Sequence, residues 1–467
     1  MALLVRSTRI ESARQRIESI LARWELDLGY ALPRPPVLAG DICQTGLGLS
    51  EADREWVREN CSSLMHSAAS LSFTADEKTG EPDRSNVGGT RNVLDFCRDT
   101  GIREFHHIST SFVAGLRTGR VLEDELDVGQ EWGNPYERSK VQAEKLVRAA
   151  DFLDSPTIYR PATIVGDSRT GFANTFHGFY APIQIGKMLI DRIKPPGITD
   201  ELSQAMQMSL GLSGDERKNF VPVDWVAQVI SYISGRPEFR GGCYALALDA
   251  PVRVDISSEA MKVALDEYAR TTYSTNMTPL DTGELNQLQS VFRDQMEIYR
   301  SHWRNDPQFD STNTRRAAPH LLPPSVDYEM LLRTSRYALR SNFCWPRPKP
   351  VRPEFDVETH LDNVAPRTSM SALPPANRLG LQVNGPGGGQ WTLGIANGQL
   401  TGVDLGMSED TVARVYMNSR LFQQLVQGQT TPDQALASGQ LNAEAGSFTT
   451  ERLSAVLEAI TTSGSPT

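Results

Sequence analysis

The stretch Tyr136-Glu137-Arg138-Ser139-Lys140 decides how the rest of the chain is interpreted. A Tyr and a Lys four residues apart lie on the same face of a helix, which is predicted here over 136–150. Upstream, Thr110 ends a predicted strand, 105–110. A phenol, an ammonium group and a hydroxyl that meet at one point can transfer a proton to a carbonyl oxygen while another group delivers hydride. Thr110, Tyr136 and Lys140 are therefore the candidate catalytic residues.

Length and composition limit the class of protein. The chain has 467 residues and a formal net charge of -10, which leaves room for two or three domains. Lysine and arginine form no long runs, so no nucleic-acid interface is expected. No apolar run is as long as a transmembrane helix, and the first residues lack the order of a signal peptide, so we expect a cytoplasmic protein without a transmembrane segment. Five widely spaced cysteines without a CxxC pair, and no HExxH spacing, indicate neither a disulfide framework nor a metal site.

Short apolar strands alternate with helices through the first third of the chain. The strands are expected at 3–6, 37–42, 64–69, 105–110 and 156–161, and the helices at 10–24, 50–60, 86–100 and 136–150. This alternation predicts an α/β fold with a doubly wound, Rossmann-like parallel sheet that helices cover on both faces. Ligands of such sheets bind at the carboxyl ends of the strands, where Arg6, Asp41, Ala68 and Thr110 lie.

The pattern changes twice further along the chain. Helices mixed with Gly- and Pro-rich loops predict a mostly helical, substrate-side region over 172–345, interleaved with a first domain over 1–250. Its helices are expected at 181–193, 225–234, 257–268 and 284–303. The proline-dense segment 346–376 is expected to be a linker. Residues 377–467 contain four predicted strands and then three helices, which indicates a separate, small α+β domain.

Four motifs near Tyr136 and Lys140 resemble the extended short-chain dehydrogenase/reductase family. Within that family they are most similar to the thioester reductase and fatty acyl reductase branch. The motifs are His66-Ser-Ala-Ala-Ser70 with Phe73, Ser109-Thr110, Arg160-Pro-Ala-Thr-Ile-Val-Gly-Asp167 with Arg169-Thr-Gly171, and Asn219-Phe-Val-Pro-Val-Asp224 with Val226. The resemblance extends over 3–249 and implies an NAD(P)H-dependent oxidoreductase.

The resemblance implies a role for each residue of the triad. Tyr136 is the general acid that protonates the substrate carbonyl oxygen. Lys140 favours the phenolate, helps to move the proton and holds the nicotinamide ribose. Thr110 holds the same oxygen by a hydrogen bond. Ser109 and Ser111 are further candidates for that role. They rank below Thr110, because a strand points them to the opposite face.

Cofactor recognition is expected at the strand ends. The resemblance places the cofactor against Arg6, Asp41, Ile42, Ala68, Ala69, Asn86, Lys140 and Pro161. An arginine at position 6 suits a 2'-phosphate, which favours NADP (NADPH) over NAD. Asn86 also suits a helix N-cap.

The family's glycine-rich phosphate-binding turn, GxxGxxG, does not precede Leu3, and the chain begins on what aligns as the second strand of the family. Two explanations are open. The gene start is placed too late by about 30 residues, the size of a strand-turn-helix unit. Otherwise the protein lacks this turn and binds the dinucleotide weakly or not at all.

The C-terminal residues resemble the sterol-carrier-protein type of lipid-binding domain. The resemblance is carried by Leu421-Phe-Gln-Gln-Leu425, Gly428, Thr431-Pro-Asp-Gln-Ala-Leu436, Ser438-Gly-Gln-Leu-Asn442 and a final helix, 450–461. It implies an apolar tunnel for an acyl chain or a sterol. The same apolar side chains could equally form a plain core, because pockets and cores look alike in a sequence.

Three functions remain open. The first is NADPH-dependent reduction of a hydrophobic acyl thioester, carried by coenzyme A or an acyl carrier protein, to an aldehyde or alcohol. The second is NAD(P)-dependent dehydrogenation or epimerisation of a sterol or hydroxy-lipid, which the same triad would serve. The third is a non-catalytic lipid-binding protein, since the phosphate-binding turn is not found.

Overall fold

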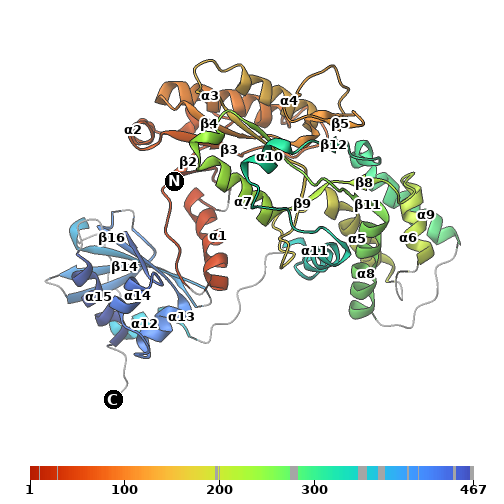
Figure 1. Cartoon of the computed structure of the whole chain (residues 1–467). Helices are drawn as coiled ribbons and strands as arrows, with labels where there is room; N and C mark the ends of the chain where they lie inside the picture. The colour runs from red at the N-terminus through yellow and green to blue at the C-terminus, as the bar shows by residue number, and fades with distance from the viewer. Residues whose placement is uncertain are drawn as a thin grey trace. The chain divides into compact units, whose positions relative to one another are not determined.

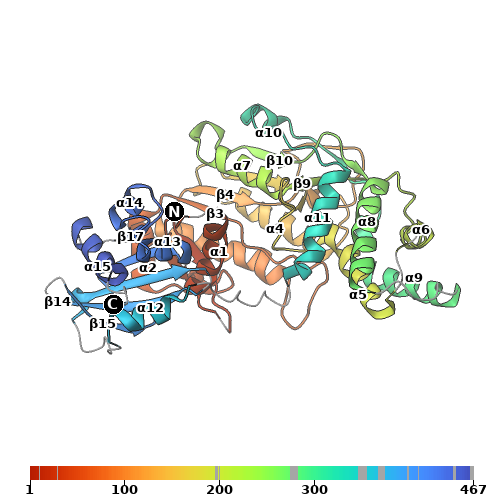
Figure 2. The same cartoon turned by 90° about the horizontal axis from the view of Figure 1, so that it is seen from below.

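The computed structural model describes the chain except residues 10, 29, 195–197, 199, 274–281, 345–354, 367–373, 386, 397–398, 409, 445–448 and 463–467. The chain separates into two compact units, whose elements Figures 1 and 2 show. Unit 1 combines Met1–Gly40 with Lys349–Thr467, and unit 2 consists of Asp41–Pro348. No helix among the described residues is both long and apolar enough to cross a bilayer.

A parallel sheet forms the centre of unit 2. Its strands are β3 (Ser63–His66), β4 (Glu104–Ile108), β6 (Thr157–Pro161) and β10 (Cys243–Leu246), in the order β10-β6-β4-β3. All three pairings are parallel, and every residue of β6 is buried. The prediction of an α/β, Rossmann-like parallel sheet is confirmed.

Helices lie on both faces of this sheet. They are α2 (Glu51–Asn60), α3 (Gly89–Thr100), α4 (Pro135–Arg148) and α7 (Val223–Ser234). In Figure 1, α3 and α4 lie above β3 and β4, and α7 lies below. Local signals fix two helix ends: Ser50 caps α2 by accepting from the Asp53 amide at 3.1 Å, and Gly101 ends α3 with a left-handed φ of 79°.

The rest of unit 2 is mostly helical. Its helices are α5 (Ala181–Ile193), α6 (Asp200–Ser209), α8 (Val254–Thr272), α9 (Thr282–Met296), α10 (Thr312–Ala317) and α11 (Tyr328–Arg340). Its short strands are β5 (Arg120–Val121), β7 (Thr163–Val165), β8 (Arg217–Lys218), β9 (Phe220–Pro222), β11 (Val252–Arg253) and β12 (Gln308–Phe309). The sequence predicts α5, α7, α8 and α9, but not α6, α10 or α11.

Unit 1 contains a five-stranded sheet in the order β15-β14-β13-β16-β17. The strands are β13 (Arg378–Asn384), β14 (Gly389–Ala396), β15 (Gln399–Leu405), β16 (Ala413–Asn418) and β17 (Asn442–Glu444). Only β13 and β16 pair in parallel. The first four strands are predicted from the sequence, and the three-residue β17 is not.

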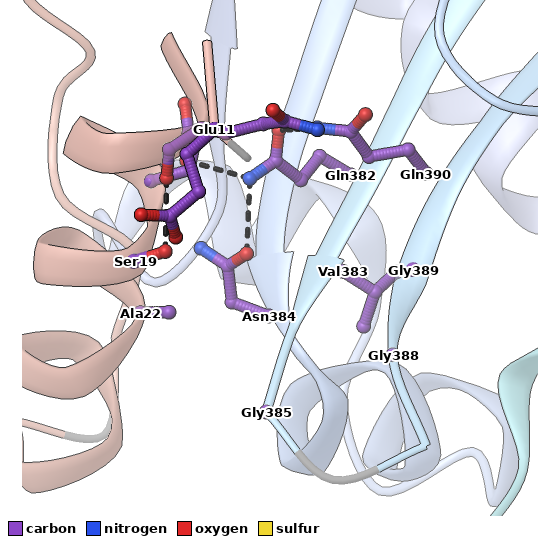
Figure 3. Close-up of a pocket in the computed structure, with 12 residues that line it drawn as sticks. Glu11, Ser19, Ala22, Gln382, Val383, Asn384, Gly385, Gly388, Gly389 and Gln390 are labelled. Carbon is purple, nitrogen blue, oxygen red and sulfur yellow. Dashed lines mark hydrogen bonds between the residues drawn. The ribbon is translucent and has the colours of Figure 1, made fainter. Parts of the chain in front are cut away.

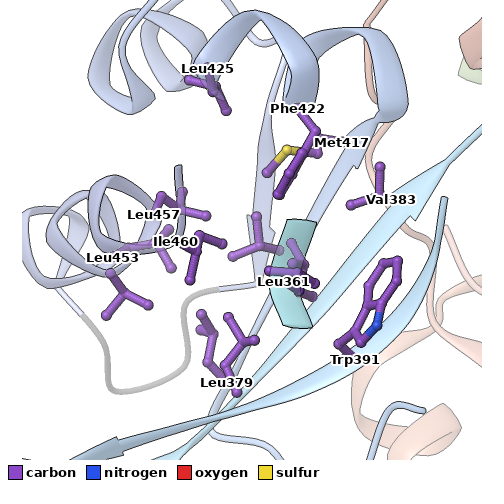
Figure 4. Packing of buried hydrophobic residues seen from close by; sticks show 14 of the residues in the cluster. Leu361, Leu379, Val383, Trp391, Met417, Phe422, Leu425, Leu453, Leu457 and Ile460 are labelled. Atoms are coloured by element: carbon purple, nitrogen blue, oxygen red, sulfur yellow. The ribbon is translucent and has the colours of Figure 1, made fainter. Parts of the chain in front are cut away.

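One face of this sheet carries a continuous apolar core (Figure 4). It is covered by α12 (Val357–Val364), α13 (Ser419–Val426), α14 (Pro432–Ala437) and α15 (Thr450–Thr462). Helix α12 lies inside the segment 346–376 that was expected to be a linker, and its Val357 and Leu361 are fully buried in this core. The segment therefore contains a core helix, which its proline density does not indicate. Its prolines at 346, 348, 350 and 353 lie outside the described residues.

The N-terminal residues also belong to unit 1. β1 (Leu3–Val5) and β2 (Val37–Ala39) form a two-stranded parallel sheet, and α1 (Ala13–Leu28) connects them. The sequence placed these residues in a first domain over 1–250, whereas their contacts group them with the C-terminal sheet.

Candidate active site

Thr110 lies directly beyond β4, where the chain turns into a short helical segment. Its hydroxyl oxygen accepts from the Phe112 amide at 3.2 Å and donates to the Pro161 carbonyl at 3.4 Å. The neighbouring hydroxyls are engaged elsewhere: Ser109 donates to Glu144 at 2.7 Å, and Ser111 donates to the Arg160 carbonyl at 2.7 Å. This supports ranking Thr110 above both serines.

Helix α4 supplies the other two residues of the triad. Asn134 caps the helix, and its side chain accepts a hydrogen bond from the Glu137 amide at 3.0 Å. Pro135 occupies the first turn, where a backbone amide would have no partner within the helix, so its missing N–H costs no hydrogen bond. The Thr110 side chain lies close enough to the Tyr136 phenol to lower its pKa by hydrogen bonding. The Lys140 ammonium donates to the Ile108 carbonyl at 2.7 Å. The structure thus brings the three predicted residues together at the carboxyl end of β4.

Burial controls the protonation of this pair. It raises the pKa of Tyr136 to about 12, although the hydrogen bond with Thr110 opposes the change. Burial also lowers the pKa of Lys140 to about 8, and the nearby Glu144 carboxylate opposes that change. Burial thus opposes the expected shift of Tyr136 toward phenolate, and the nearby Glu137 carboxylate raises the pKa of the phenol further. At neutral pH the phenol keeps its proton, and Lys140 is mostly charged.

Asn86 fixes the loop after β3 to helix α4. Its amide donates to Ser139 at 2.8 Å and to the Ser70 carbonyl at 3.0 Å, while its oxygen accepts from the Ser70 amide at 2.7 Å. Ser139 in turn donates to the Tyr136 carbonyl at 2.7 Å. Asn86 lies inside a wide helical turn that precedes α3, so it is not the N-cap that the sequence also allowed.

An aromatic cluster surrounds the phenol. Phe73 packs edge-on against Tyr136 with ring centroids 5.6 Å apart, and both Tyr299 and His302 contact Phe73 at 5.4 and 5.5 Å. Phe112 contacts His302 at 5.2 Å. The sequence motif included Phe73, but nothing local in the sequence connects Tyr299 or His302 with a helix more than 150 residues upstream.

A buried acid and a buried histidine lie beside this cluster. Burial raises the pKa of Glu137 to about 7, and its carboxylate accepts from the Gly133 amide at 2.8 Å. Burial lowers the pKa of His302 to about 3, with Lys218 and Arg304 adding to the effect. The two side chains approach to 3.9 Å. Neither residue stands out in the sequence as a candidate site residue.

The remaining cofactor predictions are distributed over the two units. Ala68 and Ala69 are exposed just beyond β3, and Pro161 ends β6. Asp41 accepts from the Cys43 amide at 2.9 Å, and the Ile42 carbonyl accepts from Asn92 at 2.7 Å. All of these residues lie in unit 2 with the triad. Arg6 follows β1 and belongs to unit 1.

Known proteins resemble much of the chain. Residues 1–230 match an NAD-binding family that is described as Male sterility protein. Aldehyde reductase lnaA of Aspergillus flavus is 26% identical over 367 residues, which are 72% of this chain and 33% of that protein. Nonribosomal peptide synthetase asaC of the same fungus is 24% identical over 258 residues, 53% of this chain and 23% of that protein. Fatty acyl-CoA reductase wat of Drosophila melanogaster is 26% identical over 172 residues, 31% of this chain and 33% of that protein.

Solved structures agree with these matches. The terminal R domain from the myxalamid PKS-NRPS biosynthetic pathway is 27% identical, with a TM-score of 0.53 over 74% of this chain and 85% of that domain. The R domain of a Mycobacterium tuberculosis nonribosomal peptide synthetase shares the fold, at 17% identity and a TM-score of 0.51 over 73% of this chain and 85% of that one. The chain spans no more than about a third of the length of these curated relatives. The first half of the chain thus resembles the NAD-binding family described as Male sterility protein, and the chain is similar in fold to the reductase domain of the myxalamid pathway.

Proposed function

We propose that the protein uses NADPH to reduce a hydrophobic acyl thioester, carried by coenzyme A or an acyl carrier protein, to an aldehyde or alcohol. The observation that carries the proposal is the meeting of Thr110, Tyr136 and Lys140 at the end of β4. An acyl thioester is the substrate class that suits relatives named fatty acyl-CoA reductase, aldehyde reductase and nonribosomal peptide synthetase.

The triad would act on the carbonyl oxygen of the thioester. A bound nicotinamide supplies the hydride that adds to the carbonyl carbon. Tyr136 gives its proton to the oxygen as negative charge develops there, and its raised pKa keeps the proton in place until then. Thr110 can donate its hydroxyl proton to the same oxygen. The carbon–sulfur bond then breaks, so that one hydride and one proton have been added and a thiol and an aldehyde leave.

The residues near the triad fit a nicotinamide cofactor. An ammonium group has three donors, and the described residues engage one of those of Lys140, with the Ile108 carbonyl. The other two are available for ribose hydroxyls. The exposed Ala68 and Ala69 are small side chains at a strand end, where a dinucleotide could approach the backbone. The choice of NADPH over NADH rests on Arg6, because a guanidinium suits a 2'-phosphate.

The aromatic cluster supports a hydrophobic substrate. Phe73, Phe112 and Tyr299 present apolar ring surface close to the phenol of Tyr136. We further propose that residues 377–467 form a sterol-carrier-protein type of domain that binds a lipid or sterol chain. Its support is the sheet with four helices packed on one apolar face (Figure 4).

The test is product analysis with the purified protein. With NADPH and long-chain acyl-coenzyme A we expect aldehyde or alcohol, and Tyr136→Phe should abolish most of the turnover. Tyr232→Phe is the matched control, since this tyrosine lies on α7 and packs against Arg236 and His320. Oxidation of a sterol or hydroxy-lipid without thioester reduction would instead favour the dehydrogenase alternative. An absence of NADPH binding at millimolar concentration would refute the enzyme and leave a lipid-binding protein.

A further inference from the structure

A short segment of unit 2 that follows α9 lies beside Tyr136, although more than 150 residues separate the two in the chain. Its Tyr299 and His302 both pack on Phe73, which packs edge-on against Tyr136. His302 also packs on Phe112, with ring centroids 5.2 Å apart. The His302 ring therefore lies between the loop that follows β3 and the loop that follows β4.

The backbone on both sides of His302 is fixed. The Ser301 hydroxyl accepts from the Asn134 side chain at 3.2 Å, and the His302 carbonyl accepts from the Lys218 ammonium at 3.0 Å. The Arg304 guanidinium donates to two carbonyls of the loop after β4, at 2.7 and 2.9 Å. The start of α4, strand β8 and this loop thus hold the segment, so that a movement of His302 is confined to its side chain.

The His302 ring carries an unpaired nitrogen. Its side chain is 22% exposed, but the Nε2 atom is buried and has no hydrogen-bond partner among the described residues. Burial lowers the pKa of this imidazole to about 3, so the ring is neutral at physiological pH, and one nitrogen can donate while the other accepts. A buried polar atom without a partner costs free energy, which favours any movement that gives it one.

A carboxylate lies just out of reach of this nitrogen. The Nε2 atom is 3.9 Å from an oxygen of Glu137. This distance is about 1 Å longer than a hydrogen bond, and it is too short for a water molecule to bridge the two atoms with good geometry. Glu137 itself is buried and accepts from the Gly133 amide at 2.8 Å and from the Asn134 side chain at 3.0 Å. The carboxylate is thus fixed, and a small rotation of the His302 side chain would complete the bond.

A rotation of His302 would reach Tyr136 through one intervening ring. Phe73 lies 5.5 Å from the His302 ring and 5.6 Å from the Tyr136 ring, measured between centroids. An apolar chain that lies on Phe73, Phe112 and Tyr299 would press on the same rings. Catalytic hydrogen bonds are often long without substrate and tighten when it binds. A displacement of about 1 Å can change a rate by up to about 100-fold.

We propose that His302 is a positioning residue for Tyr136: when an apolar acyl chain occupies the aromatic cluster, the His302 ring closes onto the Glu137 carboxylate and, through Phe73, orients the phenol. The substrate class in this inference rests on the function proposed above. An acyl chain too short to contact the three rings would leave the pair open. Chain length would then affect turnover as well as affinity.

His302→Phe separates this role from a structural one, because phenylalanine keeps the ring packing and has no nitrogen. With NADPH and long-chain acyl-coenzyme A, turnover at saturating substrate should fall about tenfold, the equivalent of one hydrogen bond. The KM should stay within about twofold. The melting temperature should stay the same or rise, because an unpaired buried nitrogen is removed. His320→Phe, at an exposed position against Tyr232, is the matched control and should change none of these values.

Glu137 variants test whether this carboxylate is the partner. Glu137→Met should also lower turnover about tenfold, and the two losses should not multiply in the double variant with His302→Phe, because both remove the same contact. Glu137→Gln should restore most of the turnover, since a side-chain amide can still donate to the Nε2 atom or accept from it.

A measurement without turnover follows the contact directly. In the full chain with 15N-labelled histidines, the His302 Nε2 resonance is identified by its loss in His302→Phe. Addition of dodecanal, without NADPH, should shift this resonance in the unaltered protein and leave it in place in Glu137→Met.

Two kinetic results would refute the inference. A loss that falls on KM alone would mean that His302 only contacts the substrate, and losses that multiply in the double variant would mean that His302 and Glu137 act separately. If no thioester is reduced, the function proposed above fails, and the nitrogen resonance still decides: a shift with dodecanal supports the closure, and an unchanged resonance refutes it. If His302→Phe does not fold, Glu137→Met takes its place in the turnover measurement with the same expected loss.

Discussion

Replacing Lys140 by methionine should make the protein more stable and less active. Burial lowers the pKa of Lys140 from its usual 10.5 to about 8, so the folded state holds this charge at a cost. The shift corresponds to about 3 kcal/mol at pH 7. Loss of the hydrogen bond to the Ile108 carbonyl offsets about 1 kcal/mol, leaving a net gain of about 2 kcal/mol in the free energy of unfolding.

The gain should depend on pH in a defined direction. Between pH 8 and 10.5 the unfolded chain keeps a proton on Lys140 that the folded protein has released, so the stability of the unaltered protein rises with pH in this window. The advantage of Lys140→Met should therefore be largest below pH 8 and shrink to about 1 kcal/mol or less at pH 9.5.

Urea unfolding of both proteins at pH 7 and pH 9.5 measures this difference, with NADPH affinity and turnover recorded alongside. Lys145→Met is the matched control, because this lysine lies on the same helix in a surface ion pair with Asp127 and should change stability by less than about 1 kcal/mol. A Lys140→Met protein that is less stable at both pH values would refute the reasoning, because the ammonium would then contribute more through its contacts than burial costs.

Three further predictions concern other residues. Tyr136→Phe should lower turnover by about 10² to 10⁴ through loss of the general acid, while urea unfolding shows the fold intact; retained turnover would contradict the mechanism. Glu137 has a pKa of about 7 in the folded protein against an ordinary value of 4.5, so stability should fall as pH rises from 4.5 to 7. Glu137→Gln should flatten this dependence, which melting temperatures at pH 5 and pH 8 can check. Leu361→Ala should destabilise unit 1 by about 2 to 5 kcal/mol, because α12 is a core helix; amide exchange in β13 that stays as slow as in the unaltered protein would mark the segment as linker.

The sequence predicts the features that depend on local spacing. The four-residue interval between Tyr136 and Lys140, the hydroxyl at the end of β4 and the period-two pattern of β13 are each encoded within a few residues. The structure brings Thr110, Tyr136 and Lys140 to the same end of β4, and side-chain caps at Ser50 and Thr431 begin two of the helices. The raised pKa of Tyr136 could not be predicted, because the burial that raises it is not a local property of the sequence.

Helix α1 shows why the rest could not be predicted. Its apolar spacing predicts a helix, but Ile20 and Trp24 remain 43% and 49% exposed, whereas Glu18 and Glu25 are buried. In a sequence, two glutamates on one face of a helix indicate that this face is exposed to solvent. Their burial here depends on partners in β13 (Figure 3), more than 350 residues away, and no local pattern reports these. Tyr299 and His302, the aromatic residues that pack on Phe73, could not be predicted for the same reason.

The shared membership of the two ends of the chain in unit 1 has a consequence for how the protein folds during synthesis. Arg14 and its hydrogen-bond partner Tyr416 are separated by 402 residues, so this contact of α1 cannot form until β16 has been translated. At about 5 to 20 residues per second, the N-terminal helix waits roughly 20 to 80 seconds for its partner. During that interval the parallel sheet of unit 2 can fold, while the carboxylates of α1 stay hydrated and keep the waiting segment from burying itself against the wrong surface. The carboxylates that later bind the C-terminal sheet would thus first keep α1 from packing before that sheet has been made.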